Sequence, residues 1–483
     1  MKKILLFTLL FFGIISTYAQ DFWLSPRQFG LDTATNGISR YRVLYNTHVA
    51  AIEQGVDVDY FGLDTLELEI PADMKTIPLT QYNSFHQLKL KVTNNSKNCF
   101  LFNRVMPAQP IDISKEMIDS GDFRSIPELS EGEYLLILED TTLWVDKRQG
   151  HNYGHKRKDI LLIKDGIAEN KPIMPYNTPE TRVVASYCQV SSEPTVISGL
   201  TLIRSAESTS KTYLFDIKNV GHLQISDIQI QTPQSTLVAD AAIRVTNVAD
   251  FSLEYIQVDG TYSCTDYYGY AFNLDNIWNS NFLHLNAHAN WGVFGTNNMN
   301  NVKVELCDIN RFDIHCYGRD VVLKDCVFSK LYNQFSSYFG ILRFEKCIFY
   351  EHTPVLLEST YSAYTPFDVV FDECIFYITN QNNYLIDGRY LSATQNTRPE
   401  VRAKNLPNIK LINSTIHLKC PIKNFYAFRF SDVTYQENVG NIKEIDYQNL
   451  NVVGGKITLK ISNKDFPHST PINFPLRNQI LGK

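Results

Sequence analysis

The middle of the chain repeats one short pattern of apolar and variable positions. Each copy reads apolar, any, apolar, any, any, small or Cys, any, apolar. The first four positions alternate as they do in a β-strand, and the two outward residues in a row mark a bend. Nine segments fit this pattern: Thr195–Leu202, Leu223–Ile230, Phe251–Val258, Phe282–Ala289, Val302–Ile309, Val321–Phe328, Leu342–Phe349, Val369–Phe376 and Ile409–Ile416.

A second pattern lies between copies of the first and ends in Asn. It reads apolar, any, apolar, any, apolar, any, Asn, which is again the alternation of a strand. The fitting segments are Tyr213–Asn219, Ala241–Asn247, Tyr270–Asn276 and Trp291–Asn297, and, with a different last residue, Phe312–Gly318 and Tyr426–Asp432. The two patterns advance together with variable gaps, so they predict a solenoid whose coils stack parallel strands.

Stacked coils place like residues in columns. Asn tolerates the left-handed backbone of a sharp bend, and its amide can bond to the Asn one coil away. The sixth position of the first pattern is Cys in four copies, Cys307, Cys326, Cys347 and Cys374. We expect free stacked thiols there, because thiols bury well, and no metal site, because one column is not tetrahedral. The predicted fold class is all-β, a parallel β-helix, since a β-sandwich does not explain two patterns kept in phase.

The N-terminal part is expected to hold a cap and irregular early coils. Arg40–Gln54 has an apolar helical face, Gly55 suits the end of this helix, and such a helix covers the open end of a solenoid. The early strands are predicted at Leu66–Ile70, His86–Val92 and Tyr134–Leu138, and an inserted loop at residues 103–131.

Residues 1–19 have the features of a secretory signal peptide. Lys2 and Lys3 precede an apolar run that is short for a membrane span, and no Cys follows it for a lipid anchor. We therefore expect a secreted or periplasmic protein of a Gram-negative bacterium. Residues 20–483 are expected to form one domain: the cap and early coils (20–185), the regular coils (186–443) and a C-terminal closure (444–483).

The second pattern also predicts which polar side chains share an outer surface. Its fourth and sixth positions face outward and form one column each, and Asp313 faces out from a second position. The fourth-position column is Asp216, Arg244, Asn273, Phe294 and His315, and the sixth-position column is Lys218, Thr246, Asp275, Thr296 and Tyr317. Such a surface suits a long sugar chain, because aromatic side chains stack on sugar rings and Arg or Lys binds carboxylates and sulfates.

The segment from Asn310 to His315 is the predicted catalytic segment. Phe312 and Ile314 are expected to point inward and hold it, while Asp313 and His315 point outward. Cleavage of a uronate chain by elimination requires neutralisation of the carboxylate, removal of the C5 proton and protonation of the leaving oxygen.

Several residues near this segment could supply those three functions. His315 or Tyr317 could take the proton, and Tyr317 or His288 could be the acid. Arg311 or Arg319 could neutralise the carboxylate. Asp313 could orient a His or hold a calcium ion, which is the one possible cofactor. An exposed Asp-x-His pair can equally be solvated surface.

Substrate-binding residues are expected on the same surface and in a basic stretch near residue 157. That stretch could fold over an anionic polymer or could be a solvated loop. The predicted substrate-binding residues are Arg244, Asn273, Asp275, Trp291, Arg319, Arg157 and Lys158.

The Phe29-Gly30 pair, the Cys and Asn columns and the stretch from Arg311 to His315 resemble the pectin-lyase-like superfamily. Within it the chain is most similar to exported bacterial polysaccharide lyases that attack uronic-acid polymers, and to some phage tail depolymerases. The resemblance implies a right-handed parallel β-helix whose first coil is closed by a Phe-Gly strand and a capping helix. It also implies β-elimination of an acidic polysaccharide, a glycosaminoglycan such as chondroitin or dermatan sulfate or hyaluronan, in an outer groove.

The chain departs from two relatives of this kind. The ordered Asn-x-Asp, Asp-Asp, Gly-His and Arg-x-Lys motifs of polygalacturonase-like hydrolases are absent, as is the Arg-x-Pro-x-x-Arg element of calcium-dependent pectate lyases. The net charge of −6 argues against a general nucleic-acid binder. We expect a monomer with an acidic polysaccharide as partner. The alternatives are an inverting glycoside hydrolase on the same scaffold and a non-catalytic carbohydrate-binding or surface protein.

Overall fold

The computed structural model describes residues 23–95, 98–102, 108–145, 155–173, 175–176, 181–204, 213–232, 241–260, 270–287, 292–315, 318–329, 332–335, 338–358, 367–389, 405–431, 441–442, 445–461 and 480–481. The expected signal peptide lies outside these ranges. No helix within them is long and apolar enough to cross a membrane.

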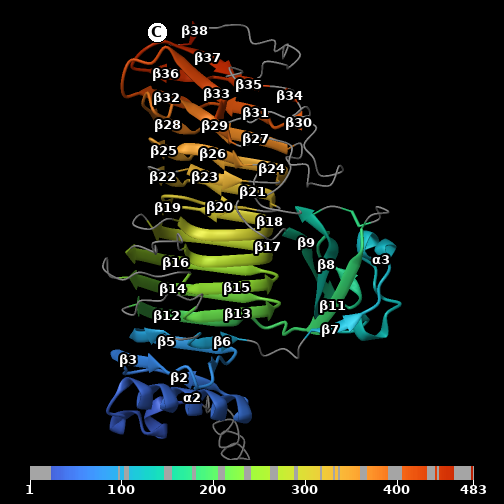
Figure 1. The fold of residues 1–483 in the computed structure, drawn as a ribbon, viewed down its shortest axis with the longest axis vertical. Coiled ribbons are helices and arrows are strands. Elements are labelled where there is room, and N and C mark those ends of the chain that lie inside the picture. Colours follow the sequence, from blue (N-terminus) through green and yellow to red (C-terminus); the bar gives the residue numbers. More distant parts are fainter. Residues whose placement is uncertain are drawn as a thin grey trace, which may run out of the picture.

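A helical cap covers the first coil (Figure 1). The cap comprises β1 (Trp23–Leu24), two 3-10 helices (Pro26–Phe29 and Leu31–Thr33) and α2 (Gly37–Gln54). Asn36 accepts a hydrogen bond from the Ser39 N–H at the start of α2, and Gly55 ends the helix at φ 67°. The predicted capping helix is confirmed. The expected Phe29-Gly30 strand is wrong, because Phe29 ends a 3-10 helix and Gly30 turns the chain at φ 90°.

Parallel strands then stack into coils, and Figure 1 shows them rising from the cap to the far end of the molecule. The early strands are β2 (Asp57–Asp59), β3 (Thr65–Ile70), β4 (Ile77–Pro78), β5 (Tyr82–Asn95) and β6 (Phe100–Phe102). The regular coils begin with β12 (Thr195–Arg204), β13 (Phe215–Val220), β14 (Leu223–Thr232), β15 (Ile243–Val248), β16 (Phe251–Gly260), β17 (Tyr270–Ala287), β18 (Gly292–Glu305), β19 (Asp308–Ile309), β20 (Asp313–Ile314), β21 (Gly318–Lys324) and β22 (Val327–Ser329).

The coils continue toward the C-terminal end in the same manner. Their strands are β23 (Tyr332–Phe335), β24 (Tyr338–Glu345), β25 (Ile348–Tyr350), β26 (Thr353–Glu358), β27 (Phe367–Asp372), β28 (Ile375–Ile378), β29 (Tyr384–Arg389), β30 (Asn405–Leu406), β31 (Asn408–Ile412), β32 (Thr415–Leu418), β33 (Asn424–Ser431), β34 (Asn441–Ile442), β35 (Ile445–Gln448), β36 (Asn451–Val453) and β37 (Ile457–Ile461). The last strand, β38 (Ile480–Leu481), pairs antiparallel with β37. The fold class is the predicted one, an all-β right-handed parallel β-helix.

The first pattern of the sequence sets the register of these coils. Thr195 pairs with Leu223, and Leu223 pairs with Phe251, so equal pattern positions lie one above another. The alternate apolar residues point inward and form one continuous core along the solenoid. In this core Phe282 stacks on Phe294, and Phe294 meets Phe312 edge to face.

The predicted columns at the bends are present, with one shift. The Asn276 amide donates to Asn247, and the Asn247 amide donates to Asn219, each at 2.9 Å. All three Asn residues have φ between 55° and 61°. The predicted free and buried thiols of the Cys column are also confirmed. The next bend is formed by Asn298, with φ 52°, and not by the expected Asn297.

The same one-residue shift corrects the outer columns. Phe272 pairs with Phe294, and Asn273 pairs with Gly295. Phe294 and Thr296 therefore point inward and are buried, although both were expected to face outward. The outward position of this coil is Gly295.

An antiparallel insert stands beside the middle coils (Figure 1). It consists of β7 (Gln109–Ile111), α3 (Lys115–Ser120), a 3-10 helix (Pro127–Leu129), β8 (Glu133–Val145), β9 (His155–Lys164), β10 (Ile167–Ala168) and β11 (Val183–Gln189). The sheet order is β10-β9-β8-β11-β7. The expectation of a coil strand at Tyr134–Leu138 is wrong, because these residues belong to β8. The described part of the expected 103–131 loop contains β7, α3 and the 3-10 helix.

The insert packs against the β-helix through a small apolar contact and several polar links. Leu135, Ile160 and Leu162 contact Ala249 and Trp278 of the β-helix. A histidine at the edge of this contact, His222, lies between two carboxylates. Its Nε2 is 3.1 Å from Glu133 of the insert and its Nδ1 is 2.9 Å from Asp250 of the β-helix.

We predict that this contact between insert and β-helix weakens as the pH rises. The hydrogen bond to Asp250 raises the pKa of His222 above its usual 6.5; partial burial opposes this, and Glu133 adds to it. A pKa raised on folding gives stability that is full below the unfolded value and is lost as the pH rises through the folded value. Hydrogen exchange of β8 and β11 should therefore be faster at about pH 8.5 than at about pH 6, after correction for the intrinsic rate.

The His222→Gln variant is the control for this prediction. Its amide has no charge to lose, so the corrected exchange of β8 and β11 should change less with pH than in the wild type. The same pH dependence in both proteins would contradict the assignment to His222.

Candidate functional site

The predicted catalytic segment lies on an outer face of the β-helix, which we call the site face. The site face comprises the outward side chains of β13, β15, β20, β23 and the first halves of β17 and β18. Asp216, Arg244, Asn273 and Gly295 form one outward column by strand register. The His315 N–H donates to the Thr296 carbonyl at 2.9 Å, which places Asp313 opposite Gly295 in this column.

Asp313 forms a buried ion pair with Arg311. Arg311 Nε is 2.5 Å from Asp313 Oδ2, and Arg311 Nη2 donates to Gln334 at 3.0 Å. The guanidinium also lies over the Tyr332 ring, 4.4 Å from its centroid. The second oxygen of Asp313 accepts from the Gln334 N–H at 3.0 Å. Asp313 is thus held by contacts on both of its oxygens.

This burial corrects two expectations. Asp313 is on the outward side, as predicted, yet it is fully covered, and Arg311 is 2% exposed. Arg311 is therefore a partner of Asp313, and it does not reach out to neutralise a substrate carboxylate. Phe312 and Ile314 point into the core as predicted.

The ion pair keeps the Asp313 carboxylate charged. Burial raises the pKa of Asp313, but the Arg311 guanidinium and His315 outweigh burial and leave this pKa below its usual value. Asp313 is consequently ionised at neutral pH and cannot act as a proton donor. An ionised, immobile carboxylate is suited to orient a neighbouring acid or base.

His315 and Tyr270 lie directly against this carboxylate. His315 Nε2 is 3.6 Å from Asp313 Oδ2 and 3.4 Å from the Tyr270 hydroxyl, which itself donates to Asp313 Oδ2 at 3.3 Å. The His315 side chain keeps 12% of its surface exposed. The three side chains form a compact group in which His315 and Tyr270 remain partly open to the outer surface.

Gly295 makes room for Tyr270 in this group. A Cβ atom at position 295 would lie 2.6 Å from a carbon of the Tyr270 ring, closer than packed atoms approach. Sequence reasoning missed Tyr270, because the apolar pattern assigned it to the inward side. The signal in the sequence was Gly295 itself, because a glycine inside a strand often marks the close approach of a neighbouring group.

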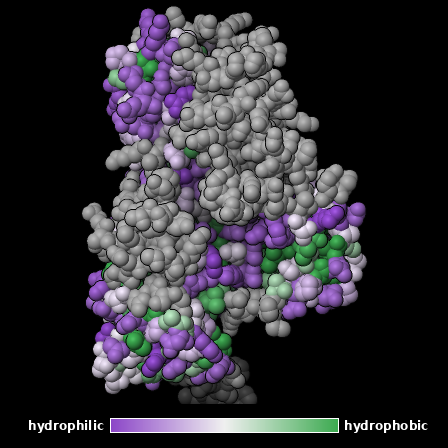
Figure 2. Space-filling model, viewed as in Figure 1, coloured by the Kyte–Doolittle hydropathy of each residue, from purple (hydrophilic) through white to green (hydrophobic). Residues whose placement is uncertain are grey.

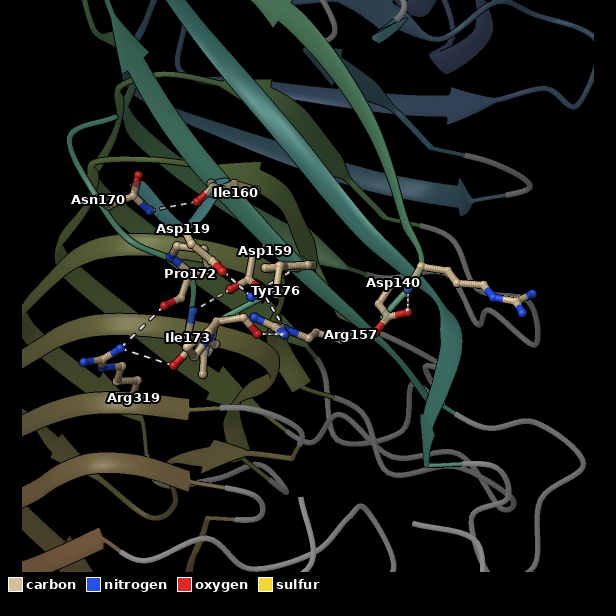
Figure 3. Close-up of polar contacts among 12 residues, drawn as sticks. Asp119, Asp140, Arg157, Asp159, Ile160, Asn170, Pro172, Ile173, Tyr176 and Arg319 are labelled. Atoms are coloured by element: carbon tan, nitrogen blue, oxygen red, sulfur yellow. Dashed lines mark hydrogen bonds and ion pairs between the residues drawn. The ribbon is translucent and has the colours of Figure 1, made fainter. Parts of the chain in front are cut away.

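The predicted substrate-binding residues that the structure describes have different contacts. Lys158 of β9 lies 3.6 Å from Asp275, so it connects the insert to the site face. Arg319 donates from Nη1 to the carbonyls of Pro172 and Ile173, as Figure 3 shows, so it also contacts the insert. Arg244 and Asn273 lie on the site face before Gly295.

Arg157 is a predicted substrate-binding residue that is buried in the structure. It is 3% exposed, pairs with Asp159 at 3.1 Å and stacks over Tyr176 (Figure 3). The expectation that Arg157 contacts a polymer is corrected, because the Arg157 guanidinium is paired with Asp159 inside the insert. The remaining candidates Tyr317, His288 and Trp291 lie outside the described residues.

The described part of the chain contains no set of ligands for the calcium ion that the sequence suggested. No group of three or more His, Cys, Asp or Glu side chains gathers there in a metal-binding arrangement. The expected role of Asp313 as a calcium ligand does not fit its contacts, because Arg311 and the Gln334 N–H already occupy both oxygens.

No protein-family model and no curated protein matches the chain. Among solved structures it is similar to the tailspike protein gp49 of Pseudomonas phage LKA1, with 11% identity and a TM-score of 0.53 over 88% of this chain and 81% of that chain. Tailspike gp61 of Pseudomonas phage phi297 has 8% identity and a TM-score of 0.46, covering 89% of this chain and 80% of that one. The Gp54 tailspike of Acinetobacter baumannii bacteriophage AP22, solved with a capsular saccharide, has 9% identity and a TM-score of 0.38 over 92% and 80%. The gp49 likeness supports the β-helix fold.

We predict that Asp313→Asn destabilises the protein strongly. The substitution leaves the buried Arg311 guanidinium without its counter-charge, which costs about 3–5 kcal/mol for buried pairs. The double variant Arg311→Met/Asp313→Leu should recover part of this loss, because it buries no unpaired charge. Denaturant unfolding gives the free energies to compare.

Asp227→Asn is the matched control for the Asp313 variant. Asp227 is exposed and has φ 54°, a conformation that Asn tolerates. Its free energy of unfolding should stay within about 0.5 kcal/mol of the wild type. An Asp313→Asn protein as stable as this control would show that the ion pair does not hold the site.

Proposed function

We propose that the chain is a polysaccharide lyase that cleaves a uronic-acid-containing acidic polysaccharide by β-elimination at His315 and Tyr270. The observation that carries the proposal is the group of His315, Tyr270 and an ionised, buried Asp313 on an outer face of a parallel β-helix. The proposed substrate class is a glycosaminoglycan such as chondroitin sulfate, dermatan sulfate or hyaluronan.

The two open side chains match the two proton transfers of elimination. In its neutral form, His315 takes the C5 proton of the uronate at Nδ1, the ring nitrogen that does not face Asp313, and electrons move to form the C4–C5 double bond as the C4–oxygen bond breaks. The Tyr270 hydroxyl donates its proton to the leaving oxygen. Asp313 orients both groups and stabilises the imidazolium formed on His315.

Neutralisation of the uronate carboxylate needs a donor near His315. Arg311 is excluded from this role because it is buried on Asp313. Asn297 follows Asp275 in the outward column that leads to His315, one coil or about 4.8 Å away. Its amide can donate to the carboxylate.

Hydrolysis fits this group less well. An inverting glycosidase uses a protonated carboxylic acid and a second carboxylate that face one space. Asp313 is ionised and inaccessible, and Asp275 accepts from Asn298 at 2.9 Å and pairs with Lys158. The described site therefore offers His and Tyr chemistry in place of a carboxylate pair.

A panel of uronate polymers tests the proposal directly. Elimination produces an unsaturated sugar that absorbs in the ultraviolet, together with a new reducing end. New reducing ends without that absorbance would show hydrolysis, and binding without new ends would show a carbohydrate-binding protein.

We predict that His315→Ala abolishes turnover while the fold is retained. The loss follows from removal of the base, and general-base catalysis alone contributes about 10²–10⁴-fold. Ultraviolet absorbance measures the rate, and circular dichroism checks the fold. His417→Ala is the matched control, because His417 stacks on Tyr377 on a different face. Full activity of the His315→Ala variant would show that His315 is not the base.

We also predict that Tyr270→Phe lowers kcat by about 10²-fold or more. The ring that covers Gly295 is kept, so the variant tests the hydroxyl alone. A substrate whose leaving group needs no proton, such as a uronate with an aryl group on its 4-oxygen, should restore much of the rate, because the phenolate leaves unprotonated. A rate equal to wild type on the natural polymer would remove Tyr270 from the mechanism.

A further inference from the structure

We propose that Arg244 and Lys218 form a second anion-binding site on the site face, which holds a carboxylate or sulfate of the polymer at a distance from His315. The identity of the ligand rests on the proposed function. The site itself rests on the charges around one buried carboxylate, Asp216.

Two cations and one amide converge on Asp216. Arg244 donates from Nε to Oδ1 at 2.8 Å and from Nη2 to Oδ2 at 2.5 Å. Lys218 Nζ is 3.2 Å from the same Oδ2, and the Asn98 amide donates to it at 3.0 Å. Among the described residues, one negative charge faces two positive charges, so this part of the cluster has an excess of one positive charge.

This positive charge is accessible and oriented. The side chains of Arg244 and Lys218 are 28% and 36% exposed, whereas Asp216 is 3% exposed. The guanidinium lies over the Tyr213 ring, 4.3 Å from its centroid, and its hydrogen bonds to Asp216 and to the Tyr213 side chain use part of its five N–H donors. A fixed arginine with donors to spare suits a carboxylate or sulfate.

Two other Arg–Asp pairs lie on this side of the β-helix. Arg311 and Asp313 are buried and neutralise each other. Arg429 is 3.1 Å from Asp387 and stacks over Tyr384. Among these three pairs within the described residues, the Asp216 pair has an added lysine, which points to anion binding there.

The spacing connects the cluster to the catalytic group. Arg244, Asn273, Gly295 and Asp313 follow one another in the same column, so three coils or about 14 Å separate Arg244 from Asp313. Figure 2 shows hydrophilic residues gathered on the surface between the β-helix and the insert. A polymer that lies along the helix axis can therefore reach both sites, and a short fragment bound at His315 cannot.

Binding measurements on the His315→Ala protein test the site without turnover. With Lys218→Gln added, the dissociation constant for long chondroitin sulfate should rise about fivefold, as a partly exposed ion pair supports. Binding of a disaccharide, and of uncharged dextran, should not change. Lys218→Gln is expected to fold, because Asp216 keeps its bonds to Arg244 and Asn98.

Lys303→Gln is the matched control, because Lys303 is exposed in the second half of β18, beyond the bend at Asn298 and outside the site face. An unchanged dissociation constant for Lys218→Gln, an equal change for Lys303→Gln, or no polymer binding at all would each overturn the site. Binding that depends on Lys218 without an unsaturated product from wild type would overturn the proposed lyase activity alone. Turnover by wild type with Lys218-independent binding would overturn only the second site.

Discussion

The register between stacked parallel strands is the constraint on which the rest of this structure depends. Each coil must place its inward residues over those of the coil before it, because a slip of one residue exchanges core and surface. The bends fix this register through left-handed residues whose amides bond to one another, as Asn219, Asn247 and Asn276 do. Columns of side chains on the outside are then a consequence of the same stacking. The site face exists because its residues come from different coils at equal positions.

Within that frame, the geometry of the candidate catalytic group depends on a buried charge. Asp313 has a fixed position because Arg311 and the Gln334 N–H bind its two oxygens, and it remains charged because Arg311 is beside it. Burial of the ion pair costs desolvation free energy. The pair in turn supplies a carboxylate that is held in place and stays ionised near neutral pH. Gly295 adds the space in which Tyr270 can lie across the column. The partly exposed side chains of His315 and Tyr270 are thus positioned by buried neighbours.

The coils, the capping helix and the thiol column could be predicted, because each leaves a periodic or local signal in the sequence. The insert could not, because the alternation at Tyr134–Leu138 is the same whether a strand joins a parallel coil or an antiparallel sheet. Phe294 was misplaced since Val293 and Phe294 are both buried, and a strict alternation allows only one of them. The segment from Arg311 to His315 was found as a candidate site. The burial of Arg311 and Asp313 depends on Tyr332 and Gln334 from the next coil, which no local pattern reveals.

The insert leaves and rejoins the solenoid at adjoining positions. Strand β6 ends at Phe102, and β12, which begins at Thr195, pairs directly with β5, so the coil ladder continues as if the insert were absent. An element joined in this way can be lengthened, exchanged or lost during evolution without a change of register in the coils. The insert carries Lys158 and approaches Arg319 beside the site face. Such a scaffold can acquire new ligand preferences through one excursion of the chain while its inherited core stays the same.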